Sequence, residues 1–192
     1  MTRNLYYGFF YRHSIPEILL WGVLLTVFWT ALALVSTRIS LKSAKAWIWA
    51  NRALLIFSVF IILWRTLLNR TPGAEHKISL IPFHSFMVAL TSSERARSVA
   101  ANILLFIPFG LSMPFVMDSG PKKDKWRTRH PVLVTLLFAA LLSLFIEFAQ
   151  YLFALGLCET DDVGANLTGA ALGSLSFVVC KKKYRFGGRP FS

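Results

Sequence analysis

A single carboxylate lies inside the apolar stretch that runs from Leu142 to Leu155, and polar residues flank it at helical spacing. Ser143, Glu147 and Gln150 occupy positions i, i+4 and i+7, so one face of a helix carries all three. An ionised group at membrane depth costs about 2.5–3.5 kcal/mol on insertion scales and normally faces a polar partner or a wet cavity. Glu147 could therefore serve as a general base or as a hydrogen-bonding residue between helices.

A second set of polar residues follows in the turn that contains Glu159, Asp161 and Asp162, and in the helix expected to open near Asn166. Asp161 or Asp162 could cap that helix, where the positive end of the dipole favours a carboxylate. The three acids could also hold Mg²⁺ or Ca²⁺. Three acids in one turn are weak evidence for a metal site, and the four histidines lack metal-ligand spacing, so no metal or other cofactor is expected.

The composition indicates the class of protein that must position these groups. Of the 192 residues, 55% are hydrophobic and 16% are charged, against about 25% charged in typical soluble domains. The apolar residues form blocks of about 18 or more, the length that crosses a bilayer. The formal net charge is +12, but the basic residues lie in short loops between these blocks. This placement favours membrane lipids as partners and argues against nucleic acid.

The blocks predict an all-α integral membrane protein with about five transmembrane helices, forming a single membrane domain over residues 1–192. The helices are expected at 16–35, 47–68, 98–117, 131–155 and 163–180. The stretch 78–90 is too short to span and predicts a re-entrant or interfacial segment. Pro108 should bend the third helix by leaving the carbonyl of Leu104 without its donor. Gly169 and Gly173 form a GxxxG pattern, which permits close helix packing.

The basic residues also predict the orientation. The first loop, the third loop and the C-terminal tail hold 14 of the 21 lysines and arginines. The positive-inside rule then places the N-terminus outside and the tail in the cytoplasm. Cys158 should face outward and Cys180 inward. With five alternating spans, one group of polar residues reaches the outer half of the membrane: Asn102, Glu147, Gln150, Asp161, Asp162 and Asn166.

Three separated blocks resemble the signature of the VanZ-like family. They are Asn102-Ile-Leu-Leu-Phe-Ile-Pro-Phe-Gly110 with Met113-Pro114, then Ser143-x-x-x-Glu147-x-x-Gln150, then Glu159-Thr-Asp161-Asp162-x-x-x-Asn166-x-x-Gly169-x-x-x-Gly173. With Leu80-Ile-Pro82-Phe83, the similarity covers a core region over residues 78–173. The family pattern commonly has an arginine before the acidic turn, where this chain has Gly156-Leu157. We expect Arg95 or Arg97 to supply the missing positive charge.

The resemblance implies a bacterial cell-envelope protein of the cytoplasmic membrane, because the name-giving member is associated with teicoplanin resistance. We therefore expect a non-enzymatic protein that binds an amphiphilic glycopeptide or a lipid-linked wall precursor in an outer-leaflet cavity. The alternative is a membrane enzyme acting on a lipid phosphate or ester, with Glu147 as base or Asp161 and Asp162 as metal ligands. The ligand-binding candidates are Asn102, Phe106, Pro108, Ser143, Glu147, Gln150, Asp161, Asp162 and Asn166.

Overall fold

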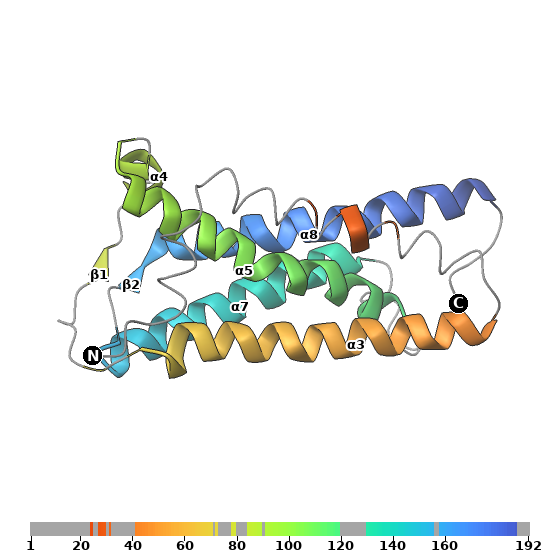
Figure 1. The fold of residues 1–192 in the computed structure, drawn as a ribbon, viewed down its shortest axis with the longest axis horizontal. Coiled ribbons are helices and arrows are strands. Elements are labelled where there is room, and N and C mark those ends of the chain that lie inside the picture. The colour runs from red at the N-terminus through yellow and green to blue at the C-terminus, as the bar shows by residue number, and fades with distance from the viewer. Residues whose placement is uncertain are drawn as a thin grey trace.

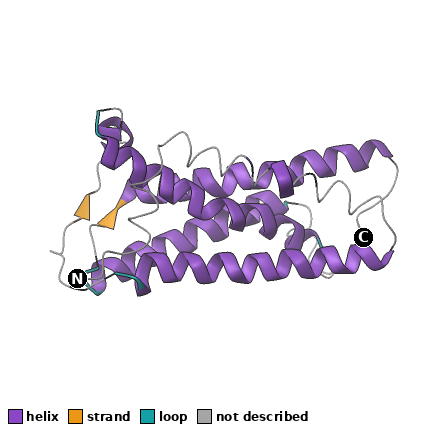
Figure 2. Cartoon of the chain, in the orientation of Figure 1, coloured by secondary structure: helices purple, strands orange, loops and turns teal. Residues whose placement is uncertain are grey.

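The computed structural model describes residues 24, 27–29, 31, 41–70, 72, 78–79, 84–89, 91–119, 130–155 and 158–187. Helices dominate this part of the chain (Figure 2). Four of them are long and apolar enough to cross a membrane: Ala46–Leu68, Ser93–Asp118, Pro131–Leu152 and Thr160–Cys180. The prediction of a helical, multi-pass membrane protein is confirmed, with four candidate spans among the described residues. The span expected at 16–35 lies mostly outside the described residues, although residues 24, 27–29 and 31 are helical.

The elements in chain order are α3 (Leu41–Leu63) with the π-helical turn η1 (Trp64–Leu68), β1 (Ile78–Ser79), α4 (His84–Ala89), α5 (Ser93–Asp118), α7 (Pro131–Leu152), β2 (Cys158–Glu159) and α8 (Thr160–Gly187). The four long helices alternate in direction along the bundle (Figure 1). The C-terminal ends of α3 and α7 therefore meet the N-terminal ends of α5 and α8. The two short strands lie at this same end of the bundle.

Helix α5 packs most extensively against α8, and glycines on both helices allow the close approach. A Cβ atom added at Gly169 would overlap the backbone carbonyl of Ile103, and one at Gly173 would overlap that of Ile107. A Cβ atom at Gly110 of α5 would overlap the carbonyl of Ala170 in the same way. The GxxxG pattern thus marks the α5–α8 interface, where the missing side chains bring the two backbones together.

Helix α5 remains helical through both of its prolines, Pro108 and Pro114. Pro114 has no N–H, so the carbonyl of Gly110 loses its usual helical donor. The hydroxyl of Ser174 on α8 reaches this carbonyl at 3.4 Å while it also donates to Ala170 at 2.8 Å. The carbonyl that Pro114 leaves open is thus partly satisfied by the neighbouring helix, as the bilayer interior requires. No contact that satisfies the carbonyl of Leu104, expected to be left open by Pro108, is seen among the described residues.

Several helix ends differ from the sequence prediction. Helix α5 begins at Ser93 instead of near residue 98, because the hydroxyl of Ser92 accepts a hydrogen bond from the backbone of Arg95 and caps the first turn. Helix α7 has Pro131 in its first turn and ends at Leu152, before residue 155. Ala154 takes a positive φ of 51°, the left-handed conformation that commonly ends a helix.

The segment expected to be re-entrant or interfacial, residues 78–90, contains the strand β1 and the six-residue helix α4. Strand β1 pairs in parallel with β2, with Ile78 opposite Cys158 and Ser79 opposite Glu159. The pairing connects the segment before α4 to the turn before α8. Two-residue strands have no sequence period to detect, so the sequence did not predict them.

The outward faces of the helices are apolar. Leu141, Leu144, Phe145 and Phe148 of α7 are all more than half exposed. The buried core, by contrast, contains Phe106, Phe109, Met113, Ile146 and Ala170. An apolar exterior of this extent is unfavourable in water and is what a lipid-facing helix requires.

Candidate functional site

The polar face predicted on α7 points into the bundle. Ser143, Glu147 and Gln150 are only 0%, 5% and 2% exposed. The intervening positions Leu144 and Phe148 face outward. The 3.6-residue period of the helix thus separates one polar stripe from the lipid-facing surface, and the predicted face is confirmed.

Asn166 of α8 lies against this stripe. Its side-chain amide donates a hydrogen bond of 2.8 Å to the hydroxyl of Ser143. Asn166 is buried, and its Oδ1 atom has no hydrogen-bond partner among the described residues. The side chain therefore links α7 to α8 and keeps one acceptor unused.

Gln150 makes a similar link to α3. Its Nε2 atom donates to the backbone carbonyl of Thr66 at 3.1 Å, across 84 residues of sequence. Thr66 lies in the last turn of the helix, where carbonyls lack intrahelical donors, so this contact satisfies one of them. Like Asn166, Gln150 is buried with an unused acceptor, its Oε1 atom, within the part of the chain that the structure describes.

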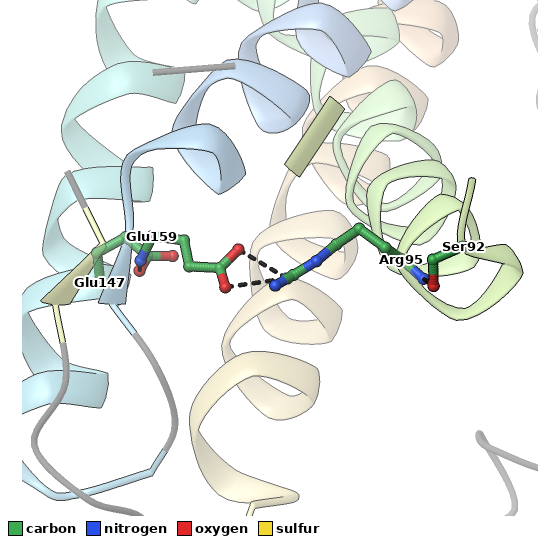
Figure 3. A network of polar contacts seen from close by, with 4 residues as sticks. All are labelled: Ser92, Arg95, Glu147 and Glu159. Carbon is green, nitrogen blue, oxygen red and sulfur yellow. Dashed lines mark hydrogen bonds and ion pairs between the residues drawn. The ribbon is translucent and has the colours of Figure 1, made fainter. Parts of the chain in front are cut away.

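Glu147 and Arg95 both contact Glu159, which lies between them (Figure 3). The backbone N–H of Glu159 donates to Oε2 of Glu147 at 2.9 Å. The carboxylate of Glu159 accepts from one guanidinium nitrogen of Arg95 at 2.8 and 2.9 Å. The side chain of Glu159 is nearly buried, whereas that of Arg95 is 29% exposed. These contacts connect α7, the turn before α8, and α5.

Asp161 and Asp162 lie inside the first turn of α8, which begins at Thr160 and not near residue 163. The expectation that one of them caps the helix from outside is wrong. Both positions still benefit from the positive end of the helix dipole. The side chain of Asn102 on α5 hydrogen-bonds to Asp162, and Arg70 and Arg95 are close enough to attract its charge.

The prediction that Arg95 or Arg97 compensates for the missing arginine is confirmed for Arg95, although Glu159 and not Asp161 or Asp162 is the direct partner. Arg70 was not anticipated as part of the site. It donates to the carbonyl of Leu155 at 3.4 Å and lies near Asp162. Its position just after the second apolar block, on the same side as Arg95 in an alternating topology, was the signal available in the sequence.

Two of the candidate residues contribute apolar surface and no polar side chain. Phe106 is fully buried in the hydrophobic core, with its ring 6.2 Å from that of Phe109. Pro108 is half-buried in α5 two residues further on.

We define the polar cluster as the polar residues that meet at this end of the bundle: Thr66, Arg70, Arg95, Asn102, Ser143, Glu147, Gln150, Glu159, Asp161, Asp162 and Asn166.

The cavity expected beside Glu147 stays a prediction. A groove that the described residues outline lies between α7 and α8, with Leu136, Ala140, Leu167 and Ala171 among its walls. Across the described ranges, no three histidine, cysteine or acidic side chains are grouped so that they could hold a metal ion. The positive charge next to Glu159 comes from Arg95.

The family model described as VanZ/LLP1 matches residues 47–181. The chain belongs to the VanZ/LLP1 family. The match includes every residue of the polar cluster and, except for Ala46, all four helices that are long enough to cross a membrane. No curated protein and no solved structure matches the chain. In this VanZ/LLP1 family member, the three motif blocks of the sequence therefore correspond to three helices whose polar residues converge at one end of the bundle.

Proposed function

We propose that this VanZ/LLP1 family protein binds the polar head of an amphiphile at the polar cluster. The ligand is an amphiphilic glycopeptide of the teicoplanin type or a lipid-linked wall precursor. The protein lies in the bacterial cytoplasmic membrane with five spans, its N-terminus outside and its C-terminus in the cytoplasm. In that orientation the cluster occupies the outer half of the membrane, where both kinds of ligand occur.

The observation that carries the proposal is the pair of buried, unused amide oxygens, Gln150 Oε1 and Asn166 Oδ1. Buried polar atoms usually have a partner, and leaving one unpaired costs about 1–3 kcal/mol. Hydroxyl and amide groups of a sugar or peptide are suitable donors for such oxygens. Asn102 and Asp162 are only half-buried and lie toward the end of the bundle, which gives a head group a polar approach.

The contacts of the carboxylates favour binding over catalysis. Glu147 accepts the backbone N–H of Glu159, and Glu159 is paired with Arg95. A carboxylate that holds a backbone segment in place is engaged before any substrate arrives. In the alternative function, an enzyme acting on a lipid phosphate or ester, Glu147 would have to act as a base or Asp161 and Asp162 would have to bind a metal.

The test is a binding measurement on the full chain in lipid nanodiscs, with teicoplanin and a lipid-linked wall precursor as probes. At least one probe should bind, and Gln150→Met and Asn166→Leu should each weaken binding about fivefold, the loss expected for one hydrogen bond. Ser176→Ala is the control, because Ser176 is buried but bonds only within its own helix, to Gly173. Failure of both probes to bind, or metal-dependent consumption of either one, would contradict the proposal.

A further inference from the structure

The groove between α7 and α8 has the shape and chemistry of a site for one hydrocarbon chain. Its volume is about 450 Å³, within the range of about 300–1,000 Å³ typical of small-ligand sites. The walls are Leu133, Leu136, Leu137, Ala140, Leu167, Thr168 and Ala171. The hydroxyl of Thr168 donates to Gly164 in its own helix, so it offers little to a polar ligand.

The groove faces the surroundings of the bundle and lies within two of the membrane-spanning helices. Leu133 and Leu137 on its rim are each 48% exposed. The spans Pro131–Leu152 and Thr160–Cys180 supply its two sides. The groove is therefore surrounded by lipid, and a molecule that binds in it must be apolar.

The groove suits the length and thickness of part of an acyl chain. From Leu133 to Ala140 it extends about 10 Å along α7, at 1.5 Å per residue. An extended acyl chain can lie along the small side chains of Ala140 and Ala171, which form part of its walls.

One end of the groove lies next to the polar cluster. Ala140 precedes Ser143 by about one helical turn, and Leu167 directly follows Asn166. Ser143 and Asn166 are hydrogen-bonded to each other, so the two helices hold this end of the groove beside the buried amides. A polar head at the cluster and a chain in the groove are therefore positioned to belong to one molecule.

We infer that the α7–α8 groove holds the acyl chain of the amphiphile whose head binds the polar cluster. This inference rests on the proposed function and adds the second half of the ligand. Binding of the acyl chain in the groove makes the protein selective for acylated molecules. The bilayer is as apolar as the groove, so the selectivity comes from van der Waals packing and from the fixed distance between head and chain.

The test fills the groove without touching the polar cluster. Ala140→Leu and Ala171→Leu place a larger side chain in the groove, whereas Ala53→Leu makes the same change on the exposed surface of α3. In nanodiscs, the first two variants should weaken teicoplanin binding by about fivefold, as expected from lost packing. They should leave the binding of de-acylated teicoplanin unchanged, and Ala53→Leu should affect neither.

A second measurement is independent of the head group. A phosphatidylcholine with a photoreactive acyl chain should cross-link to groove residues more than to the exposed Ile56 and Phe57 of α3, and teicoplanin should compete. Cross-linking without competition would assign the groove to bulk lipid and overturn the inference. Equal teicoplanin binding by Ala171→Leu and Ala53→Leu would also overturn the inference. That result would not contradict binding of the head group at the polar cluster. If neither teicoplanin nor the wall precursor binds the wild-type protein, both proposals are wrong.

Discussion

At the scale of single residues, Glu147 positions the backbone that leads into α8. Its Oε2 atom accepts the N–H of Glu159, and a glutamine has an oxygen that can accept the same bond. We therefore expect Glu147→Gln to keep ligand binding and to lose less stability than Glu147→Leu. The leucine variant leaves a buried N–H unpaired, which costs about 1–3 kcal/mol. Thermal unfolding in detergent, together with probe binding, measures both variants. A glutamine variant that folds normally and binds nothing would instead indicate that the ligand needs the charge of the Glu147 carboxylate.

The Arg95–Glu159 pair gives a second prediction at this scale. Removing one partner of a fully buried ion pair costs about 3–5 kcal/mol, and the partial exposure of Arg95 lowers this figure. We expect Arg95→Met to destabilise the protein by about 2 kcal/mol, since it leaves the nearly buried Glu159 charge without this cation. Adding Glu159→Gln should recover most of that loss. Unfolding of the single and double variants gives the coupling free energy, and a coupling near zero would show that the pair does not hold the turn in place.

At the scale of elements, the close packing of α5 on α8 keeps the polar ends of both helices in register. A methyl group at Gly169 or Gly173 would meet backbone atoms that no side-chain rotation can move. We expect Gly169→Ala and Gly173→Ala each to cost about 1–3 kcal/mol, or to prevent folding. Leu175→Ala is the control, because Leu175 lies on the exposed side of α8. Denaturant unfolding in mixed micelles provides the comparison, and glycine variants as stable as the control would show that the helices can separate freely.

The elements also show which features the sequence could reveal. Helical periodicity was sufficient to place Ser143, Glu147 and Gln150 on one buried face, because that relation depends on a single helix. The partners of these residues were not predictable in the same way. The bonds from Gln150 to Thr66 and from Asn166 to Ser143 join different helices, and their geometry depends on how the helices pack. The charge of the acidic turn did predict a basic partner, since like charges in a short turn repel one another, and Arg95 is that partner.

At the scale of the whole molecule, the alternating helices place the acidic turn and the start of α5 at one end and the start of α7 at the other. Cys180, expected to mark the inner side, is fully buried beside Phe115 and Phe177, so a maleimide would not report its location. Thr91 and His130 are exposed at opposite ends and are better markers. In a cysteine-free background, Thr91→Cys should react with an impermeant maleimide on intact cells, and His130→Cys only after permeabilisation. The reverse pattern would invert the proposed orientation.

The central claim is that a polar head group binds at the buried amides of α7 and α8. The most direct measurement is an electron cryo-microscopy map of the full chain purified with its native lipids. Non-protein density should lie within hydrogen-bonding distance, about 2.7–3.2 Å, of Gln150 Oε1 and Asn166 Oδ1, and should continue into the α7–α8 groove. A well-resolved map in which both oxygens bond only to protein or water would contradict the claim.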